Sequence, residues 1–146
     1  MPNISVPILT VCDATHEREG LLGILGGGIT VINRESYPAP LAADIAAQLQ
    51  LTDVSAGDSI SVTLSITHAD GEPVEIEDLD FKASFDNSAE LLSLPLTINA
   101  RDMKIPRSGK YKISISSADG PLSAVDFIAL EVQPATDEMA PEAQHS

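Results

Sequence analysis

The 146 residues of this chain include 22 acidic and 8 basic side chains, and a net charge of −14 argues against nucleic acid and anionic membranes as partners. At 43% hydrophobic residues, the composition is that of one globular domain, large enough to fold without disulfides or a metal. No stretch approaches the ~20 apolar residues of a membrane span. The single Cys12 cannot form an internal disulfide, so we expect a cytoplasmic protein.

Short runs of alternating apolar and polar residues, typical of half-buried β-strands, fill the first third of the chain. The first predicted strand covers residues 4–13, and residues 15–20 form a polar connection. A second strand covers residues 21–33, and its continuous apolar character predicts burial of both faces. Residues 41–51 have a composition that favours helix, but they also alternate. Their position among strands favours a strand.

The clearest alternation, at residues 59–68, is followed by Asp70-Gly71 and a further apolar run at 74–85. A strand, an Asp-Gly pair and a second strand predict a β-hairpin. In the second arm the apolar positions change phase after Asp78, which predicts a β-bulge.

The last third of the chain continues the pattern with a strand at 89–100 and a second hairpin made of residues 111–116 and 122–132. Beyond Val132 the sequence is acidic and has no periodicity. We therefore expect one domain at residues 1–132 and a disordered tail at 133–146. About eight strands with little helix predict an all-β fold, an antiparallel, immunoglobulin-like β-sandwich.

Two resemblances support this prediction. Residues 105–109 are predicted to form a turn. The segment 106–111, followed by the alternating Ile113 and Ile115, is similar to the turn and tyrosine strand of many immunoglobulin-like domains, although their Cys–Trp–Cys core is absent here. Most of the chain resembles a family of small uncharacterised bacterial β-sandwich proteins. The segments that carry this second resemblance are Val11-Cys12-Asp13, Leu22-Gly23-Ile24-Leu25-Gly26, Tyr37-Pro38, Gly109-Lys110-Tyr111 and Asp119-Gly120. It implies a bacterial or phage origin and the fold, but no activity.

Two features invite a catalytic or cofactor-binding interpretation. Cys12, Asp13 and His16 include a nucleophile, an acid and a base, but catalytic Cys–His pairs normally come from distant segments. Cys12 also falls on a predicted strand, which favours a buried side chain. The triplet Gly26-Gly27-Gly28 lacks the lysine and the helix start of a phosphate-binding loop. We interpret it as a bulge or a strand crossing, and we expect no catalytic residue and no cofactor.

The densest acidic cluster falls on the first hairpin and comprises Asp70, Glu72, Glu75, Glu77, Asp78 and Asp80. Calcium prefers several carboxylate oxygens, so a calcium-dependent binder or a metal-dependent hydrolase is one alternative. The EF-hand pattern is absent, and Glu75 and Glu77 alternate with apolar neighbours as solvent-facing strand residues do. We favour a charged row that protects a sheet edge, and we predict no metal site.

Most of the basic residues fall within one short segment, at Arg101, Lys104, Arg107, Lys110 and Lys112. They form either a polar turn or an electrostatic docking face for an acidic partner, including the acidic hairpin of a second copy. We therefore predict a non-enzymatic protein-interaction or structural module, with these five residues as the protein-binding site. A subunit of a larger assembly remains an alternative.

Overall fold

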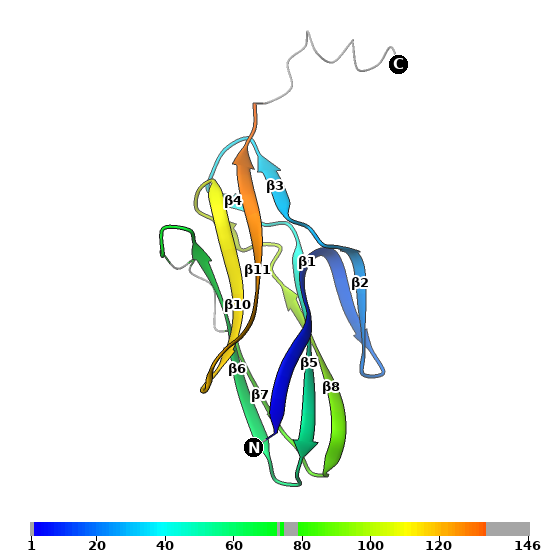
Figure 1. Cartoon of the computed structure of the whole chain (residues 1–146). Helices are drawn as coiled ribbons and strands as arrows, with labels where there is room; N and C mark the ends of the chain where they lie inside the picture. The colour runs from blue at the N-terminus through cyan, green and yellow to red at the C-terminus, as the bar shows by residue number, and fades with distance from the viewer. Residues whose placement is uncertain (1, 73, 75–78, 134–146) are drawn as a thin grey trace.

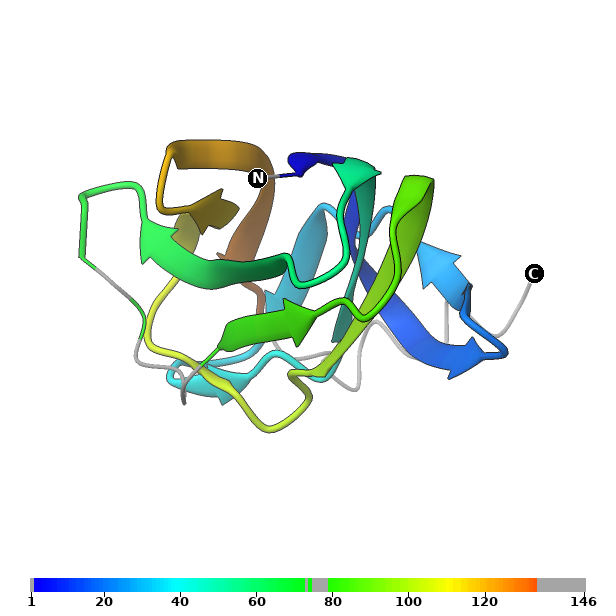
Figure 2. The ribbon, with the colours of Figure 1, turned by 90° about the horizontal axis from the view of Figure 1, so that it is seen from below.

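The computed structural model describes residues 2–72, 74 and 79–133, and these residues form eleven β-strands and no helix. Two sheets pack face to face as a sandwich (Figure 1), and a view along the strands shows the sheets as separate layers (Figure 2). The all-β fold predicted from the alternation is therefore confirmed. The strand count is higher than the expected eight, because short strands form where the sequence suggested loops.

The first sheet contains four antiparallel strands in the order β2-β1-β5-β8. Their bounds are β1 (Asn3–Arg18), β2 (Leu21–Gly27), β5 (Asp44–Val54) and β8 (Ala89–Asn99). The first half of β1 pairs with β5, whereas its second half pairs with β2 alone. That second half and β2 therefore form a hairpin that projects from the side of the sandwich (Figure 1). We call residues 13–27 the hairpin arm.

The second sheet contains five strands in the order β3-β11-β10-β6-β7. Their bounds are β3 (Val31–Arg34), β6 (Ser59–His68), β7 (Asp80–Ser84), β10 (Gly109–Ser117) and β11 (Gly120–Glu131). Its pairs are antiparallel except for β3 with β11, which is parallel. The expectation of an antiparallel sandwich is corrected at this pair. The chain crosses from the first sheet to the second between β2 and β3, so β3 arrives in the direction of β11.

The core lies between the two sheets and is built by the alternation itself. On β5, Ile45, Ala47 and Leu49 point inward and are fully buried, and on β10 Tyr111, Ile113 and Ile115 do the same. Alternate residues of a strand point to opposite faces, so one apolar residue in two is enough to fill the interior. Phe127 of β11 stacks on Tyr111 with ring centroids 5.2 Å apart.

Tyr111 also closes the turn that precedes β10. Its hydroxyl donates to the Arg107 carbonyl oxygen at 2.5 Å, and the Tyr111 hydroxyl oxygen in turn accepts the Arg107 amide at 3.3 Å. A tyrosine hydroxyl that bonds to the backbone a few residues upstream is the tyrosine corner of immunoglobulin-like sandwiches. This contact gives a structural basis for the hairpin resemblance. We call the turn before β10, together with Tyr111 and the His68 and Phe127 rings packed against it, the tyrosine corner.

The segment at residues 21–33 is two strands rather than the single buried strand that we expected. β2 ends at Gly27, where Gly26 and Gly28 have φ angles of 63° and 81°, a region that L-residues rarely adopt. Side chains of β2 face solvent, and Leu21 and Leu25 are each 69% exposed. The predicted burial of both faces is wrong, because β2 lies at a sheet edge and pairs only with β1. We expected a bulge or a strand crossing at the glycines; in the structure β2 ends there and the chain passes to β3 of the second sheet.

The polar connection expected at residues 15–20 is also mostly strand, since β1 continues to Arg18. The turn itself consists of Glu19 and Gly20, whose φ angles are 54° and 78°. Two successive positive φ angles are the requirement of a tight type I′ hairpin turn. Asn or Asp usually occupies the first of these positions. Because Glu19 stands there instead, the sequence did not indicate a tight turn.

The remaining elements follow the expectations with shifted ends. Residues 41–51 are mostly strand, as preferred, and the strands at 59–68 and 89–100 and the second hairpin are present. The first hairpin pairs β6 with β7 from Asp80 onward, while the expected bulge falls at residues 75–78, outside the described residues. The tail also lies outside them from residue 134 onward. A small additional sheet pairs β4 (Ala39–Pro40) with β9 (Lys104–Ile105).

Candidate functional site

The five basic residues do not share one face. Arg101 follows β8, and its Nε lies 3.5 Å from Oδ1 of Asp44 on the first sheet. Lys104 belongs to β9, while Lys110 and Lys112 belong to β10 of the second sheet. Because Asp44 and the two β10 lysines belong to different sheets, the predicted docking face divides into separate parts.

Arg107 is engaged within its own chain at the tyrosine corner. Its guanidinium forms an ion pair with Asp70, and its Nη2 lies 3.3 Å from Oε2 of Glu72. His68 completes the cluster: its Nε2 donates to the Ser108 carbonyl at 3.1 Å, and its ring stands edge-on to Tyr111. The acidic turn of the first hairpin is therefore already the partner of Arg107, which lies in the turn immediately before β10.

Lys110 and Lys112 lie on the outer face of β10, because the inward positions between and after them are Tyr111 and Ile113. Lys110 is opposite Ile128 of β11, and Ile128 is in turn opposite Val31 of β3. Leu130 and Val132 continue the same side of β11. These four aliphatic residues are between 38% and 44% exposed. We call the two lysines and the four aliphatic residues the apolar–basic face.

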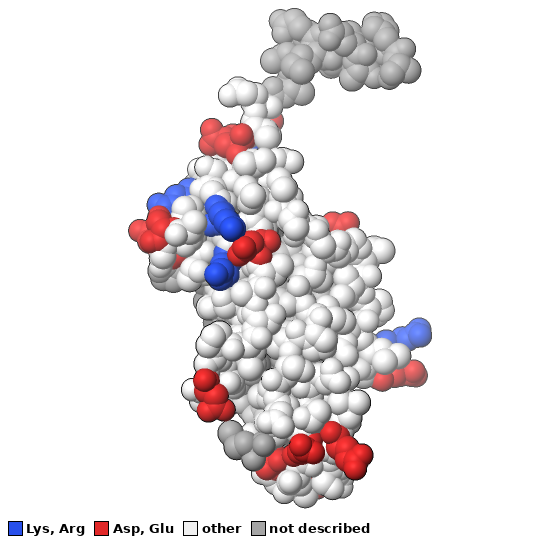
Figure 3. Space-filling view, in the orientation of Figure 1, with Lys and Arg blue, Asp and Glu red and all other residues white. Residues whose placement is uncertain are grey.

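The molecular surface shows this arrangement. In Figure 3, basic and acidic atoms gather at the upper left, around the start of β10, and an uncharged area extends beside them over β11. The acidic partner here is Asp126, whose Oδ2 lies 3.4 Å from Nζ of Lys110. No ion pair of Lys112 is present in the described part of the chain.

Cys12 is fully buried, as predicted, but it does not belong to the main core. Cys12 and Ala46 are both 0% exposed and lie on the outer side of the first sheet, where the hairpin arm leaves the sandwich. The Cys12 thiol donates a weak hydrogen bond to the Asp44 carbonyl at 3.7 Å. Burial, with smaller contributions from Asp44 and Asp13, raises the pKa of Cys12. A raised pKa opposes the thiolate that a nucleophilic cysteine needs.

His16 does not pair with Cys12. Its ring covers Gly23 on the neighbouring strand so closely that a β-carbon at Gly23 would lie 2.1 Å from Cε1 of the ring. Nearby, the buried carboxylate of Asp44 accepts the Thr15 amide at 3.2 Å through Oδ2. Thr15, Asp44 and Arg101 thus tie the base of the arm to the sandwich, which is a structural role.

The metal-binding alternative gains no support from the described residues. Among them, no three His, Cys, Asp or Glu side chains are grouped closely enough to hold a metal ion. Asp70 and Glu72 are paired with Arg107, and the hydroxyl of Thr63 donates to Asp80 at 2.6 Å. The remaining acids of the cluster, Glu75, Glu77 and Asp78, lie outside the described residues.

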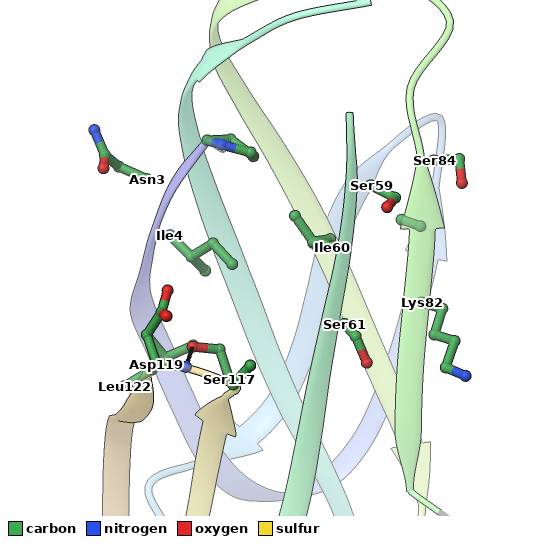
Figure 4. Close-up of a pocket in the computed structure, with 13 residues that line it drawn as sticks. Asn3, Ile4, Ser59, Ile60, Ser61, Lys82, Ser84, Ser117, Asp119 and Leu122 are labelled. Atoms are coloured by element: carbon green, nitrogen blue, oxygen red, sulfur yellow. Dashed lines mark hydrogen bonds between the residues drawn. The ribbon is translucent and has the colours of Figure 1, made fainter. Parts of the chain in front are cut away.

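A cavity of about 600 Å³ lies at the end of the sandwich where β1 begins. Serine hydroxyls and aliphatic side chains line most of it, and its titratable lining residues among the described ones are Lys82 and Asp119. Figure 4 shows these two on opposite sides of the cavity.

Residues 7–130 match the sequence model of a protein family that is described as a family of unknown function (DUF6941). The chain belongs to DUF6941. Apart from the start of β1 and the last residue of β11, the matched range contains both sheets, and it contains the hairpin arm and all of the apolar–basic face except Val132. These are therefore features of the DUF6941 domain in this chain. None of the curated proteins compared with the chain matches it. No segment of the described DUF6941 chain forms the long apolar helix that a helical membrane crossing requires.

Solved structures resemble this DUF6941 protein in fold. The structure of β-glucosidase from Listeria innocua in complex with glucose superimposes with a TM-score of 0.51 at 8% identity, over 92% of this chain and 16% of that one. β-Glucosidase 3B from Thermotoga neapolitana in complex with α-D-glucose gives a TM-score of 0.46 at 15% identity, over 87% and 16%. The chain spans about a sixth of the length of either enzyme, and at such low identity the first likeness concerns the fold alone.

Proposed function

We propose that this protein is a non-enzymatic binding module that holds a protein partner on the apolar–basic face. One observation carries the proposal: exposed aliphatic side chains and two lysines share the outer surface of three adjacent strands. Protein interfaces commonly combine an apolar centre with a polar rim. Ile128 and Leu130 would supply the centre, and Lys110 and Lys112 the rim.

The charges favour a partner with carboxylates beside apolar side chains. Lys110 contacts Asp126, but both side chains are about half exposed, and an ion pair in such a position contributes little. Both lysines therefore remain available to a partner. Arg107 is less suited to this role, because it would have to give up its contacts with Asp70 and Glu72 to bind a partner. Two of the five basic residues thus carry the electrostatic part of the proposal.

Site-specific photocrosslinking in the native host tests the proposal. A photoreactive residue at Ile128 should give a covalent adduct with one protein, and the same residue at Thr97, on the first sheet, should not. Lys110→Glu with Lys112→Glu should abolish the Ile128 adduct, since rim charges steer the encounter. The matched control is Lys82→Glu with Lys104→Glu, which changes the net charge equally.

Two results would contradict the proposal. One is an adduct of equal yield from Ile128 and Thr97, and the other is an Ile128 adduct that survives the reversal of both lysines. Raising the salt from 0.1 M to 1 M should also lower the yield, because the screening length falls from ~10 Å to ~3 Å.

A further inference from the structure

The hairpin arm has a second surface that the proposed function does not use, the free edge of β2. Within the described residues β2 pairs with β1 alone, so the backbone groups along its other edge have no strand partner. Figures 1 and 2 both place the arm at the side of the sandwich, away from the second sheet. An edge of this kind is a template for another strand.

Natural proteins usually protect such edges, and the other outer strands of this molecule are protected. β7 carries Asp80 and Lys82, β8 carries Glu90 and Pro95, and β3 is only four residues long. Charge, proline and short length are the common protections. β2 has none of them: its seven residues are Leu, Gly and Ile alone. No residue from Gly20 to Asn33 is charged.

We propose that the occupant of this edge is β2 of a second copy, paired antiparallel about a twofold axis at Ile24. In that register Leu21 is opposite Gly27 of the other copy, Leu22 opposite Gly26, and Leu25 opposite Gly23. Each leucine therefore meets a glycine, and Ile24 meets itself. A strand whose large and small residues exchange in this way is self-complementary, as a twofold interface requires.

The charge of the chain limits where a second copy can bind. The chain carries a net charge of −14, so two copies repel each other over most of their surface. The edge of β2 is a place where they can meet without opposing like charges. The exposed Leu21 and Leu25 would become diagonal neighbours across the new strand pair, within reach of each other.

Sedimentation velocity from ~1 μM to ~1 mM, a range that spans weak to moderate affinities, tests the proposal on the full chain. The wild-type chain should change from monomer to dimer over this range. Leu25→Lys should raise the dissociation constant by ~10-fold or more, because each dimer would then place two lysines at the strand pair. The melting temperature should not change, since Leu25 is 69% exposed.

The matched control is Leu91→Lys, which alters a leucine of 59% exposure on β8, another outer strand. It should leave the dissociation constant unchanged, as should Lys110→Glu with Lys112→Glu on the apolar–basic face. The second control separates this proposal from the proposed function. A chain that stays monomeric over the whole range, or a dimer that Leu25→Lys and Leu91→Lys weaken equally, would overturn the pairing.

A disulfide cross-link tests the register. In a Cys12→Ala background, Ile24→Cys should give an oxidised dimer, because residues directly opposite in an antiparallel pair lie within disulfide distance. Thr30→Cys, on the same uncharged segment but beyond β2, is the control and should not give one. A dimer that Leu25→Lys dissociates but that Ile24→Cys does not cross-link would overturn the twofold axis at Ile24.

Discussion

The tyrosine corner and the hairpin arm are both β-hairpin structure with alternating side chains, yet they use their apolar residues in opposite ways. At the corner, Tyr111 and Phe127 are at most 1% exposed and stack on each other. On the arm, Leu21 and Leu25 are 69% exposed. The difference lies in what covers each strand. The inward side chains of the corner face the first sheet, whereas the exposed leucines of the arm face solvent. The apolar residues of the arm are therefore not explained by the stability of the monomer.

Removing an aromatic ring from the corner should show the largest difference between the two regions. Phe127→Ala should lower the free energy of unfolding by about 3–5 kcal/mol, because it empties a fully buried site. Leu25→Ala on the arm should cost less than about 0.5 kcal/mol. Urea denaturation of the two variants at low protein concentration measures both values. Similar costs would show that the arm packs as tightly as the corner.

A smaller difference is expected between two glycines with positive φ. Gly109, at the corner, has a φ of 133°, and a β-carbon there would lie 2.3 Å from Nε2 of His68. Gly20, at the tip of the arm, has open space around it. Gly109→Ala should therefore cost about 2–3 kcal/mol of stability, and Gly20→Ala about 1 kcal/mol from backbone strain alone. Thermal melting of the two variants gives the order, and the reverse order would contradict the tight packing at Gly109.

The hydroxyl of Tyr111 should contribute about 1–2 kcal/mol, since Tyr111→Phe leaves the Arg107 carbonyl without its donor. Burial raises the pKa of Tyr111, so the unfolded chain loses this proton at lower pH than the folded chain. Stability from this source is complete below about pH 10 and declines as the pH rises further. The variant should therefore lose less stability than the wild type between pH 9 and 11, measured by urea denaturation. Burial also raises the pKa of Tyr37 and of Cys12, so the variant should keep part of the pH dependence over this range.

Cys12 lies where β1 leaves the sandwich for the arm, and its reactivity reports how firmly the arm is attached. If only global unfolding exposes the thiol, alkylation in native buffer should be at least ~1000-fold slower than in denaturant. Local detachment of the arm would give a smaller difference that depends little on urea. Rapid labelling of the native chain would contradict the burial of Cys12.

The smallest effect is expected at the C-terminus, which follows both regions in the sequence. A chain that ends at Val132 should melt within a few degrees of the full chain, because residues 133–146 have no apolar periodicity with which to offset their ordering entropy. Scanning calorimetry of the two chains measures the difference. A larger drop would show that the tail contacts the body.

Local pattern was sufficient to predict most strands. The run at 59–68 alternates without interruption, and β6 has those same bounds. Gly109 and Tyr111 likewise predicted the turn and the strand of the corner. These predictions succeeded because the period of the side chains and the chemistry of a turn are set within a few residues.

The sequence did not show which strand faces are covered by another sheet and which face solvent. The leucines of β2 are apolar, so the sequence predicted that they are buried. They are exposed instead, because β2 lies at the edge of a sheet. In the same way, the basic residues at 101–112 are neighbours in sequence, but β9 and β10 carry them to different surfaces. Lys110 and Lys112 were identifiable from their charge. Their aliphatic neighbours were not, because Val31 and Ile128 meet only in the folded sheet.

The position of β11 has a consequence for the timing of folding. β11 is the last strand of the chain, yet it lies between β3 and β10 in the middle of the second sheet. The pairing partner of β3 is therefore synthesised roughly a hundred residues after β3 itself. At ~5–20 residues per second this separation corresponds to a delay of roughly 5–20 s. During this interval the arm is already complete and its uncharged edge is exposed. On a ribosome, the nascent chain therefore presents β2 to its surroundings before the sandwich can close.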